Sequence, residues 1–93
     1  MTRATNATTE QLRSLVESEA RKVGMLAPTE RLHTVTDKSG FRAVVDGPYG
    51  TRAFEPADGS GYLGKTRREA ETALSYILTT FRAIRRTQTG NAR

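Results

Sequence analysis

The sequence contains no cysteine and no tryptophan, and aromatic residues occupy only 6% of its 93 positions. Without cysteine the chain can form neither disulfides nor cysteine-ligated zinc sites. Its unbroken apolar runs are two or three residues long, whereas a membrane-spanning helix needs ~20. The first residues likewise lack the apolar stretch of a signal peptide. We therefore expect a cytoplasmic protein that does not use a membrane.

The chain is also short of the residues that catalysis and metal binding need. His33 is the one histidine, and no Ser/His/Asp arrangement can be assembled around it. A chain of this length is expected to fold as one domain that buries roughly 60% of its unfolded surface, so its core is small. We expect no enzymatic activity, no cofactor and no metal site.

Positive charge is concentrated at one end of the sequence. Lysine and arginine exceed aspartate and glutamate by 15 to 10, which gives a net charge of +5. Residues 1–63 contain eight basic and eight acidic residues, whereas residues 64–93 contain seven basic and two acidic ones. This asymmetry favours a polyanion or an acidic protein surface as partner. A simpler explanation is that arginines near the end of a helix stabilise its dipole.

The first half of the chain predicts one helix. Thr8 and Gln11 form a capping-box pattern, and Gly24 suits the left-handed position after a helix end. Apolar residues between them recur at helical spacing: Leu12, Leu15, Val16, Ala20 and Val23. The opposite face carries charged residues with i,i+4 spacing, which we expect to be solvated: Arg13, Glu17 and Arg21.

Three short strands are predicted after this helix, at residues 32–36, 41–46 and 51–54. Turn residues at 37–40 and 47–50 separate them, and such short connections require antiparallel pairing. Alternate residues of the middle strand share the face that must be covered: Phe41, Ala43 and Val45.

A long C-terminal helix at residues 67–86 is the expected cover. Thr66 is a good N-cap with Glu69 three residues on. One apolar sector follows along this helix: Ala70, Leu74, Ile77, Phe81 and Ile84. The predicted fold is a small two-layer α+β domain of order α-β-β-β-α, with a three-stranded antiparallel sheet. We expect it to span residues 8–86, between disordered tails at 1–7 and 87–93.

The segment Gly59–Thr66 spells G-x-x-x-x-G-K-T, the pattern of a phosphate-binding loop. Such a loop directly follows a buried strand and needs later strands to supply an acidic metal ligand. Here Pro56, Ala57 and Asp58 intervene, and only one helix remains downstream. We therefore interpret the segment as a flexible link into the helix. The helix start and its basic residues still favour a single phosphate group.

Basic and aromatic residues suggest candidate contacts with a nucleic acid. On the last helix a stripe lies opposite the apolar sector: Arg68, Ser75, Thr79, Arg82 and Arg86. Lys65, Arg67 and Arg68 surround the helix start, while Arg42, Arg52 and Lys38 are expected on one exposed sheet face. Tyr49 and Tyr62 lie in glycine-flanked loops and are candidates for stacking or for a protein interface.

Two segments carry a resemblance to a known family: residues 41–54, from Phe41-Arg42-Ala43 through Gly47-Pro48-Tyr49-Gly50 to Phe54, and Lys65-Thr66-Arg67-Arg68-Glu69-Ala70. They resemble the arm-type DNA-binding domain of phage integrases, which has three strands and a helix. The resemblance implies that Arg42 and Arg52 face a DNA groove.

The α-β-β-β-α order, Gly47-Pro48 between strands and the glycine-rich entry to a basic helix start are similar to the double-stranded RNA-binding domain. That likeness implies phosphate contacts by Lys65, Arg67 and Arg68. The small size and the Arg/Thr/Ala-rich composition also resemble accessory proteins of actinobacterial phages.

The leading hypothesis is a non-enzymatic nucleic-acid-binding accessory protein, with DNA favoured over RNA. The alternative is a small protein-binding modulator, of the kind a phage directs at a host protein, that docks through its first helix or a sheet edge. The small core also makes a homodimer plausible. Peripheral membrane binding by the basic helix is disfavoured because the sheet needs its apolar face.

Overall fold

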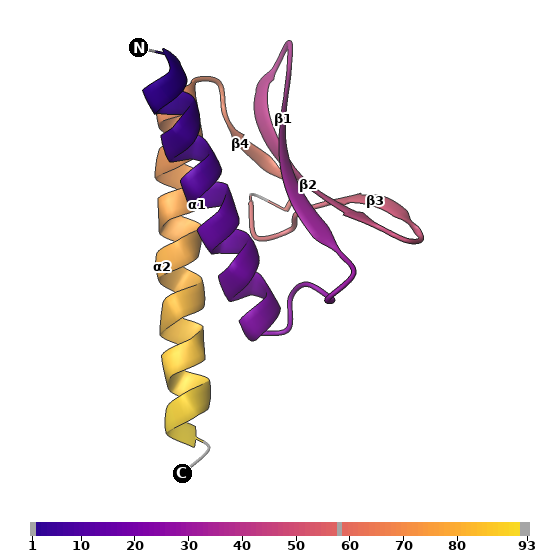
Figure 1. Cartoon of the computed structure of the whole chain (residues 1–93), viewed down its shortest axis with the longest axis vertical. Coiled ribbons are helices and arrows are strands. Elements are labelled where there is room, and N and C mark those ends of the chain that lie inside the picture. Colours follow the sequence, from indigo (N-terminus) through magenta and orange to yellow (C-terminus); the bar gives the residue numbers. More distant parts are fainter. Residues whose placement is uncertain (1, 58, 92–93) are drawn as a thin grey trace.

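The computed structural model describes residues 2–57 and 59–91. In chain order the elements are helix α1 (Thr2–Lys22), strands β1 (Arg31–Asp37), β2 (Gly40–Gly47), β3 (Gly50–Ala53) and β4 (Tyr62–Gly64), and helix α2 (Arg67–Asn91). The two helices lie side by side and form one layer, and the antiparallel sheet forms the other (Figure 1). The α+β two-layer prediction is therefore confirmed, with one strand more than expected.

Both helices are longer than the apolar periodicity indicates. Helix α1 begins at Thr2 instead of near Thr8, and α2 continues through Asn91 instead of ending near Arg86. Most of the expected tails at 1–7 and 87–93 is thus helical, while Met1, Ala92 and Arg93 lie outside the described residues. Residues 2–7 contain neither glycine nor proline, so nothing in them stops an established helix from extending.

The capping box expected at Thr8 and Gln11 is wrong for the same reason, because these residues lie inside α1. The expected end of the helix is confirmed. Gly24 has φ +87°, the amide of Met25 donates to the carbonyl of Ala20 at 2.8 Å, and the amide of Gly24 donates to that of Arg21 at 3.2 Å. These two bonds form a Schellman motif, which satisfies the last carbonyls of α1.

Strand β2 is the centre of the sheet. On one side every residue of β1 pairs with β2, from Arg31 opposite Asp46 to Asp37 opposite Gly40. The other side is shared by two short strands, since β3 pairs with the second half of β2 and β4 with its beginning. The segment expected to be a flexible link therefore supplies a strand.

Gly61 makes this shared edge possible. Its carbonyl accepts the amide of Ala43 at 2.6 Å, and the amide of Phe54 donates to the carbonyl of Ala43 at 3.1 Å. Gly61 has φ +86°, and a Cβ there would collide with the Ala43 carbonyl oxygen. Only glycine allows this close backbone approach.

The core lies between the sheet and both helices. Ala43 and Val45 are fully buried and Phe41 packs against the same cluster, which confirms the predicted inward face of β2. The rings of Phe54 and Phe81 meet edge to face with centroids 6.2 Å apart. The buried residues come from every layer: Val16, Ala20, Leu26, Leu32, Ala43, Val45, Phe54, Ala57, Leu63, Ala70, Leu74, Ile77, Leu78 and Phe81.

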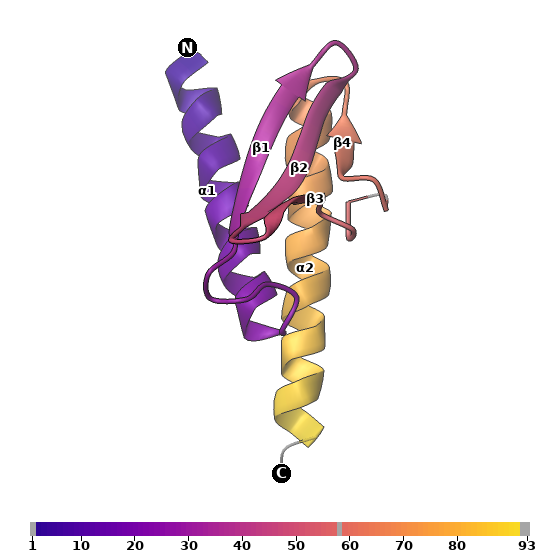
Figure 2. The same cartoon turned by 90° about the vertical axis from the view of Figure 1, so that its right-hand side faces the viewer.

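The two helices run in the same direction. Near their beginnings the Thr9 hydroxyl donates to the Glu71 carboxylate at 2.7 Å, and near their ends Arg85 pairs with Glu19 at 2.8 Å. Both views of the molecule show this side-by-side arrangement (Figures 1 and 2). Helix α1 therefore covers the sheet together with α2, which the sequence pattern did not predict.

Candidate nucleic-acid interface

Helix α2 begins at the predicted cap. The Thr66 hydroxyl accepts the amide of Glu69 at 3.1 Å, and the Glu69 carboxylate accepts the amide of Lys65 at 2.8 Å. Gly64, with φ +149°, lies so close to Glu69 that a Cβ would stand 2.5 Å from the Glu69 Cβ. The segment G-x-x-x-x-G-K-T thus forms a short strand and a helix cap. The Glu69 carboxylate accepts the Lys65 amide, which is one of the backbone donors that a phosphate-binding loop would offer to its ligand.

The β1–β2 turn packs directly against this helix start. Gly40 has φ +130°, and a Cβ there would overlap the Gly64 carbonyl and stand 2.7 Å from the Cα of Lys65. Figure 2 shows the turn and the start of α2 at the same end of the molecule. The contact brings together basic residues from two distant parts of the sequence, which we call the basic end: Lys38, Arg42, Lys65, Arg67 and Arg68.

Asp37 and Tyr62 fix the shape of the turn. The Asp37 carboxylate accepts the amides of Ser39 at 2.7 Å and Gly40 at 3.2 Å, and Arg42 at 3.1 Å. The bond from Ser39, with smaller effects of Arg42 and Gly40, lowers the pKa of Asp37 below its usual range. The Tyr62 hydroxyl donates to the Ser39 carbonyl at 2.9 Å, which ties β4 to the turn that carries Lys38.

The ring of Tyr62 already contacts a residue of the basic end. The Arg42 guanidinium lies 5.5 Å from its centroid, in a cation–π arrangement. Tyr62 therefore positions the basic end, and this contact competes with the stacking role predicted for it. Tyr49 is fully exposed at the tip of the β2–β3 turn, which points away from the helices (Figure 1). The structure does not bring the two tyrosines together.

Arg42 and Arg52 do not share a sheet face, contrary to the prediction. Arg52 lies opposite Val45, whose side chain points to the helices, whereas Arg42 alternates with the inward residues of β2. Arg52 instead pairs with Glu30 at 3.2 Å, and one of its nitrogens lies 3.5 Å from the carbonyl of Met25. The amide of Ala27 and then Arg52 lower the pKa of Glu30. Arg52 thus braces the loop after α1.

Arg82 and Arg86 lie on the exposed side of α2, with Arg68. Arg82 follows Arg68 by ~21 Å along the axis at about 1.5 Å per residue. Between them the Thr79 hydroxyl donates to the Ser75 carbonyl at 3.0 Å, so the helix itself satisfies this polar group. Arg85 differs from its neighbours because it pairs with the buried Glu19.

Ion pairing separates the basic residues into two sets. Arg13, Arg21, Lys22, Arg42, Arg52 and Arg85 form ion pairs. Among side chains that the structure describes, the remaining basic residues form none: Arg31, Lys38, Lys65, Arg67, Arg68, Arg82 and Arg86. Six of these seven belong to the basic end or to the exposed side of α2. Their charges are therefore not cancelled by direct ion pairs, although the Glu69 carboxylate at the Lys65 amide reduces the positive field there.

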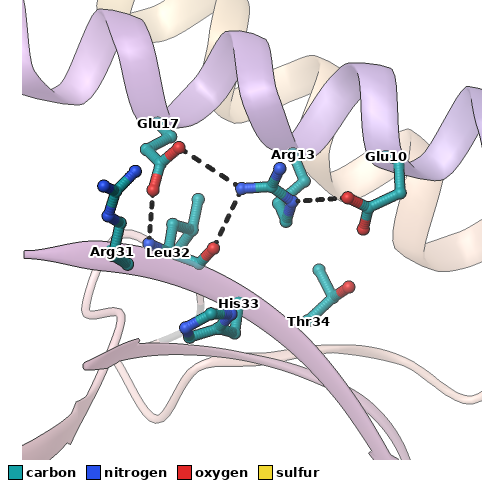
Figure 3. A pocket seen from close by; sticks show the side chains of 7 residues that line it. All are labelled: Glu10, Arg13, Glu17, Arg31, Leu32, His33 and Thr34. Atoms are coloured by element: carbon teal, nitrogen blue, oxygen red, sulfur yellow. Dashed lines mark hydrogen bonds and ion pairs between the residues drawn. The ribbon is translucent and has the colours of Figure 1, made fainter.

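Sequence reasoning missed a polar contact between α1 and β1. Arg13 donates to the Leu32 carbonyl at 3.0 Å, and Glu17 accepts the Leu32 amide at 2.7 Å (Figure 3). Glu17 also pairs with Arg13 and Arg21, so the predicted i,i+4 pairs exist, but they pack against the sheet instead of facing solvent. Burial would raise the pKa of Glu17, yet the Leu32 amide and the two arginines outweigh it and lower this pKa.

Comparison with protein-family models, curated proteins and solved structures found no match to this chain. Within residues 2–57 and 59–91, neither helix combines the length and apolar character needed to cross a membrane. The same residues bring no three His, Cys, Asp or Glu side chains into a metal-binding group.

Proposed function

We propose that this protein binds nucleic acid without catalysing a reaction, and that the basic end forms the centre of its contact surface. The observation that carries the proposal is the packing of Gly40 against Gly64 and Lys65, which gathers five basic residues. Of these, Arg42 pairs with Asp37, and the other four form no ion pair with a side chain that the structure describes. Duplex DNA is the first substrate to test, and duplex RNA is the second. Such a protein would act as a small cytoplasmic accessory factor of the kind that phages encode.

The expected mode of binding is contact with phosphates. Lysine and arginine at the basic end would bind one stretch of backbone, and Arg82 and Arg86 a second stretch ~21 Å further along α2. Phosphate contacts fix position and carry no sequence information. Affinity should therefore fall steeply with salt and depend little on base sequence. Arg52 is left out of this surface because Glu30 engages it.

Fluorescence anisotropy with labelled duplex DNA, single-stranded DNA and duplex RNA at two salt concentrations tests the proposal. With Z phosphate contacts, the logarithm of the duplex DNA association constant should fall with a slope near −0.9Z against the logarithm of salt concentration. Arg68→Glu should weaken binding about tenfold and make this slope smaller by about one.

Arg31→Glu is the matched control, because it makes the same charge change at an exposed arginine that forms no ion pair with a described side chain. Arg31 begins β1 and so lies at the end of the strand away from the β1–β2 turn. We expect it to weaken binding less than threefold through the general field. Equal loss in both variants would contradict a localised site, and absence of binding at low salt would contradict nucleic-acid binding itself.

The alternative, a protein-binding module, has two candidate docking surfaces, the first helix and a sheet edge. The apolar face of α1 is not free, because Val16 and Ala20 are fully buried and Leu12 and Val23 pack against the core. A docking helix would need that face exposed. The sheet edge is the surface on which this alternative now depends.

A further inference from the structure

Strand β1 forms one edge of the sheet, and the backbone amide and carbonyl of Leu32 on this edge point away from β2. Its carbonyl accepts Arg13 at 3.0 Å and its amide donates to Glu17 at 2.7 Å, so both groups face α1. In an antiparallel pair, the residues that point to the partner strand alternate with those that point outward. Leu32, opposite Val45, is therefore an outward residue of β1.

The same alternation turns the backbone amides and carbonyls of Thr34 and Thr36 outward. At Leu32 the side chains of α1 take the place of a neighbouring strand, but the hairpin stands away from α1 toward its turn (Figure 1). A polar hollow of about 330 Å³ lies between α1 and the first half of β1, lined by Glu10, Arg13, Glu17, Arg31, Leu32, His33 and Thr34. Figure 3 shows Thr34 on the strand beside this hollow, across from Glu10.

The two edges of the sheet differ in a way that favours pairing at β1. The opposite edge consists of strands of four and three residues, too short to offer a continuous ladder. Strand β1 has seven residues, contains no proline or glycine, and carries the β-branched run Thr34-Val35-Thr36. Natural sheets guard such edges with proline, bulges or inward charges, and none of these occurs at residues 34–36.

The charges around this edge indicate the partner's chemistry. Arg31 and Lys38 flank the strand at its two ends. Both are exposed, and neither pairs with an acidic side chain that the structure describes. At ~3.3 Å per residue, they stand about 23 Å apart along the chain. Three carboxylates lie nearby, and each is paired: Glu10 with Arg13, Glu17 with Arg13 and Arg21, and Asp37 with Arg42. An extended segment bound here would meet net positive charge.

We propose that the edge of β1 from Thr34 to Asp37 binds an extended acidic peptide by strand addition. The outward amides and carbonyls of Thr34 and Thr36 would form the ladder, and Arg31 and Lys38 would attract acidic side chains at the two ends. Arg13 and Glu17 would stop the added strand at Leu32, because they already satisfy both of its backbone groups.

Three synthetic seven-residue peptides test this proposal with the full-length protein. All alternate valine with a second residue, which is glutamate, threonine or lysine. We expect the glutamate peptide to bind best in fluorescence anisotropy and to slow hydrogen exchange of the Thr34 and Thr36 amides, while the Val35 amide, already paired with β2, stays unchanged. A dissociation constant weaker than about 1 mM for the glutamate peptide would overturn the proposal.

Backbone substitutions separate strand addition from charge attraction. Thr36→Pro removes one outward amide and suits an edge strand, so the fold should persist while peptide affinity falls at least about tenfold. Thr36→Ala, which keeps the amide, is its control. Folding is checked by far-ultraviolet circular dichroism. Unchanged affinity in folded Thr36→Pro would overturn the proposal.

Two charge reversals keep this test independent of nucleic-acid binding. Arg31→Glu should weaken binding of the glutamate peptide severalfold, and Arg68→Glu should leave this affinity unchanged. For DNA we expect the opposite pattern, so failure of one proposal leaves the other testable. Equal weakening of the peptide by both reversals would show that it binds the basic end instead of the β1 edge.

Discussion

The arginines of the two helices serve different purposes. In α1, Arg13 and Arg21 bind Glu17 and the backbone carbonyls of Leu32 and Glu30, so their charges hold the helix to the sheet. In α2, Arg68, Arg82 and Arg86 of the exposed side form no ion pair with a side chain that the structure describes. Together with Arg67, these are the arginines of the two helices, among the side chains that the structure describes, whose charge is not balanced by a paired carboxylate. Ion pairing is thus a better guide to a binding surface than composition.

The largest effect is expected from reversing the exposed charges of α2. Arg68→Glu, Arg82→Glu and Arg86→Glu together should weaken duplex binding about a thousandfold, if each reversal costs about a factor of ten. The free energy of unfolding should change by less than ~1.5 kcal/mol, since each of the three exposed substitutions should cost no more than about 0.5 kcal/mol. Anisotropy and urea denaturation measure the two quantities. Substantial destabilisation would show that these arginines support the fold, as those of α1 do.

The reciprocal substitution in α1 should damage the fold instead. Glu17→Ala removes a buried carboxylate, which leaves the Leu32 amide without its partner and takes the carboxylate that Arg13 and Arg21 share. We expect a loss of about 2–4 kcal/mol in the free energy of unfolding, measured by urea denaturation. Glu10→Ala, which breaks an exposed pair with Arg13, should cost about 0.5 kcal/mol or less. Similar losses in both variants would contradict the structural role of Glu17.

Acid should weaken the contacts that Glu17 makes from α1. The pKa of Glu17 is lower in the folded protein than in the unfolded chain, so its stabilisation is complete above the unfolded value of about 4.3. That stabilisation is lost as the pH falls through the folded value. Urea denaturation below about pH 5 should show declining stability. Glu17→Gln should have a shallower decline, and an identical pH profile would rule out Glu17 as a source.

The smallest effect concerns Tyr62 and Tyr49. Tyr62→Phe removes the hydroxyl bond to Ser39, which should cost about 0.5–1 kcal/mol of stability. By loosening the turn that carries Lys38, it should also weaken duplex binding two- to threefold. Tyr49→Ala, at a fully exposed turn tip, should change neither quantity. Weaker duplex binding after Tyr49→Ala would instead extend the contact surface to the β2–β3 turn.

Local chemistry predicted those features that depend on neighbouring residues in the sequence. The cap at Thr66, the glycine after α1 and the inward face of β2 were all correct, because propensity and alternation determine them. The apolar sector of α2 was correct for the same reason, except that Ile84 at its end is partly exposed.

Features that depend on distant contacts could not be read from the sequence. Strand β4 exists because Gly61 approaches Ala43, and no periodic pattern marks a three-residue strand. The sheet face on which Arg52 lies depends on how β3 is aligned with β2. The predicted strand at 51–54 did not specify this register. Arg13 and Glu17 showed ordinary i,i+4 spacing, and only the position of β1 turns this spacing into a tertiary contact. The basic end itself joins a turn and a helix start 24 residues apart.

The parallel pairing of α1 and α2 has a consequence for synthesis on the ribosome. The residues that join the helices are 62 and 66 positions apart, so α1 lacks its helical neighbour until the last third of the chain emerges. At roughly 5–20 residues per second, the segment from Lys22 to Arg67 takes several seconds to make. During that interval α1 can contact β1, but the part of its apolar side that packs against α2 stays uncovered. Nascent chains stalled before α2 should therefore be captured by chaperones, whereas complete chains should escape.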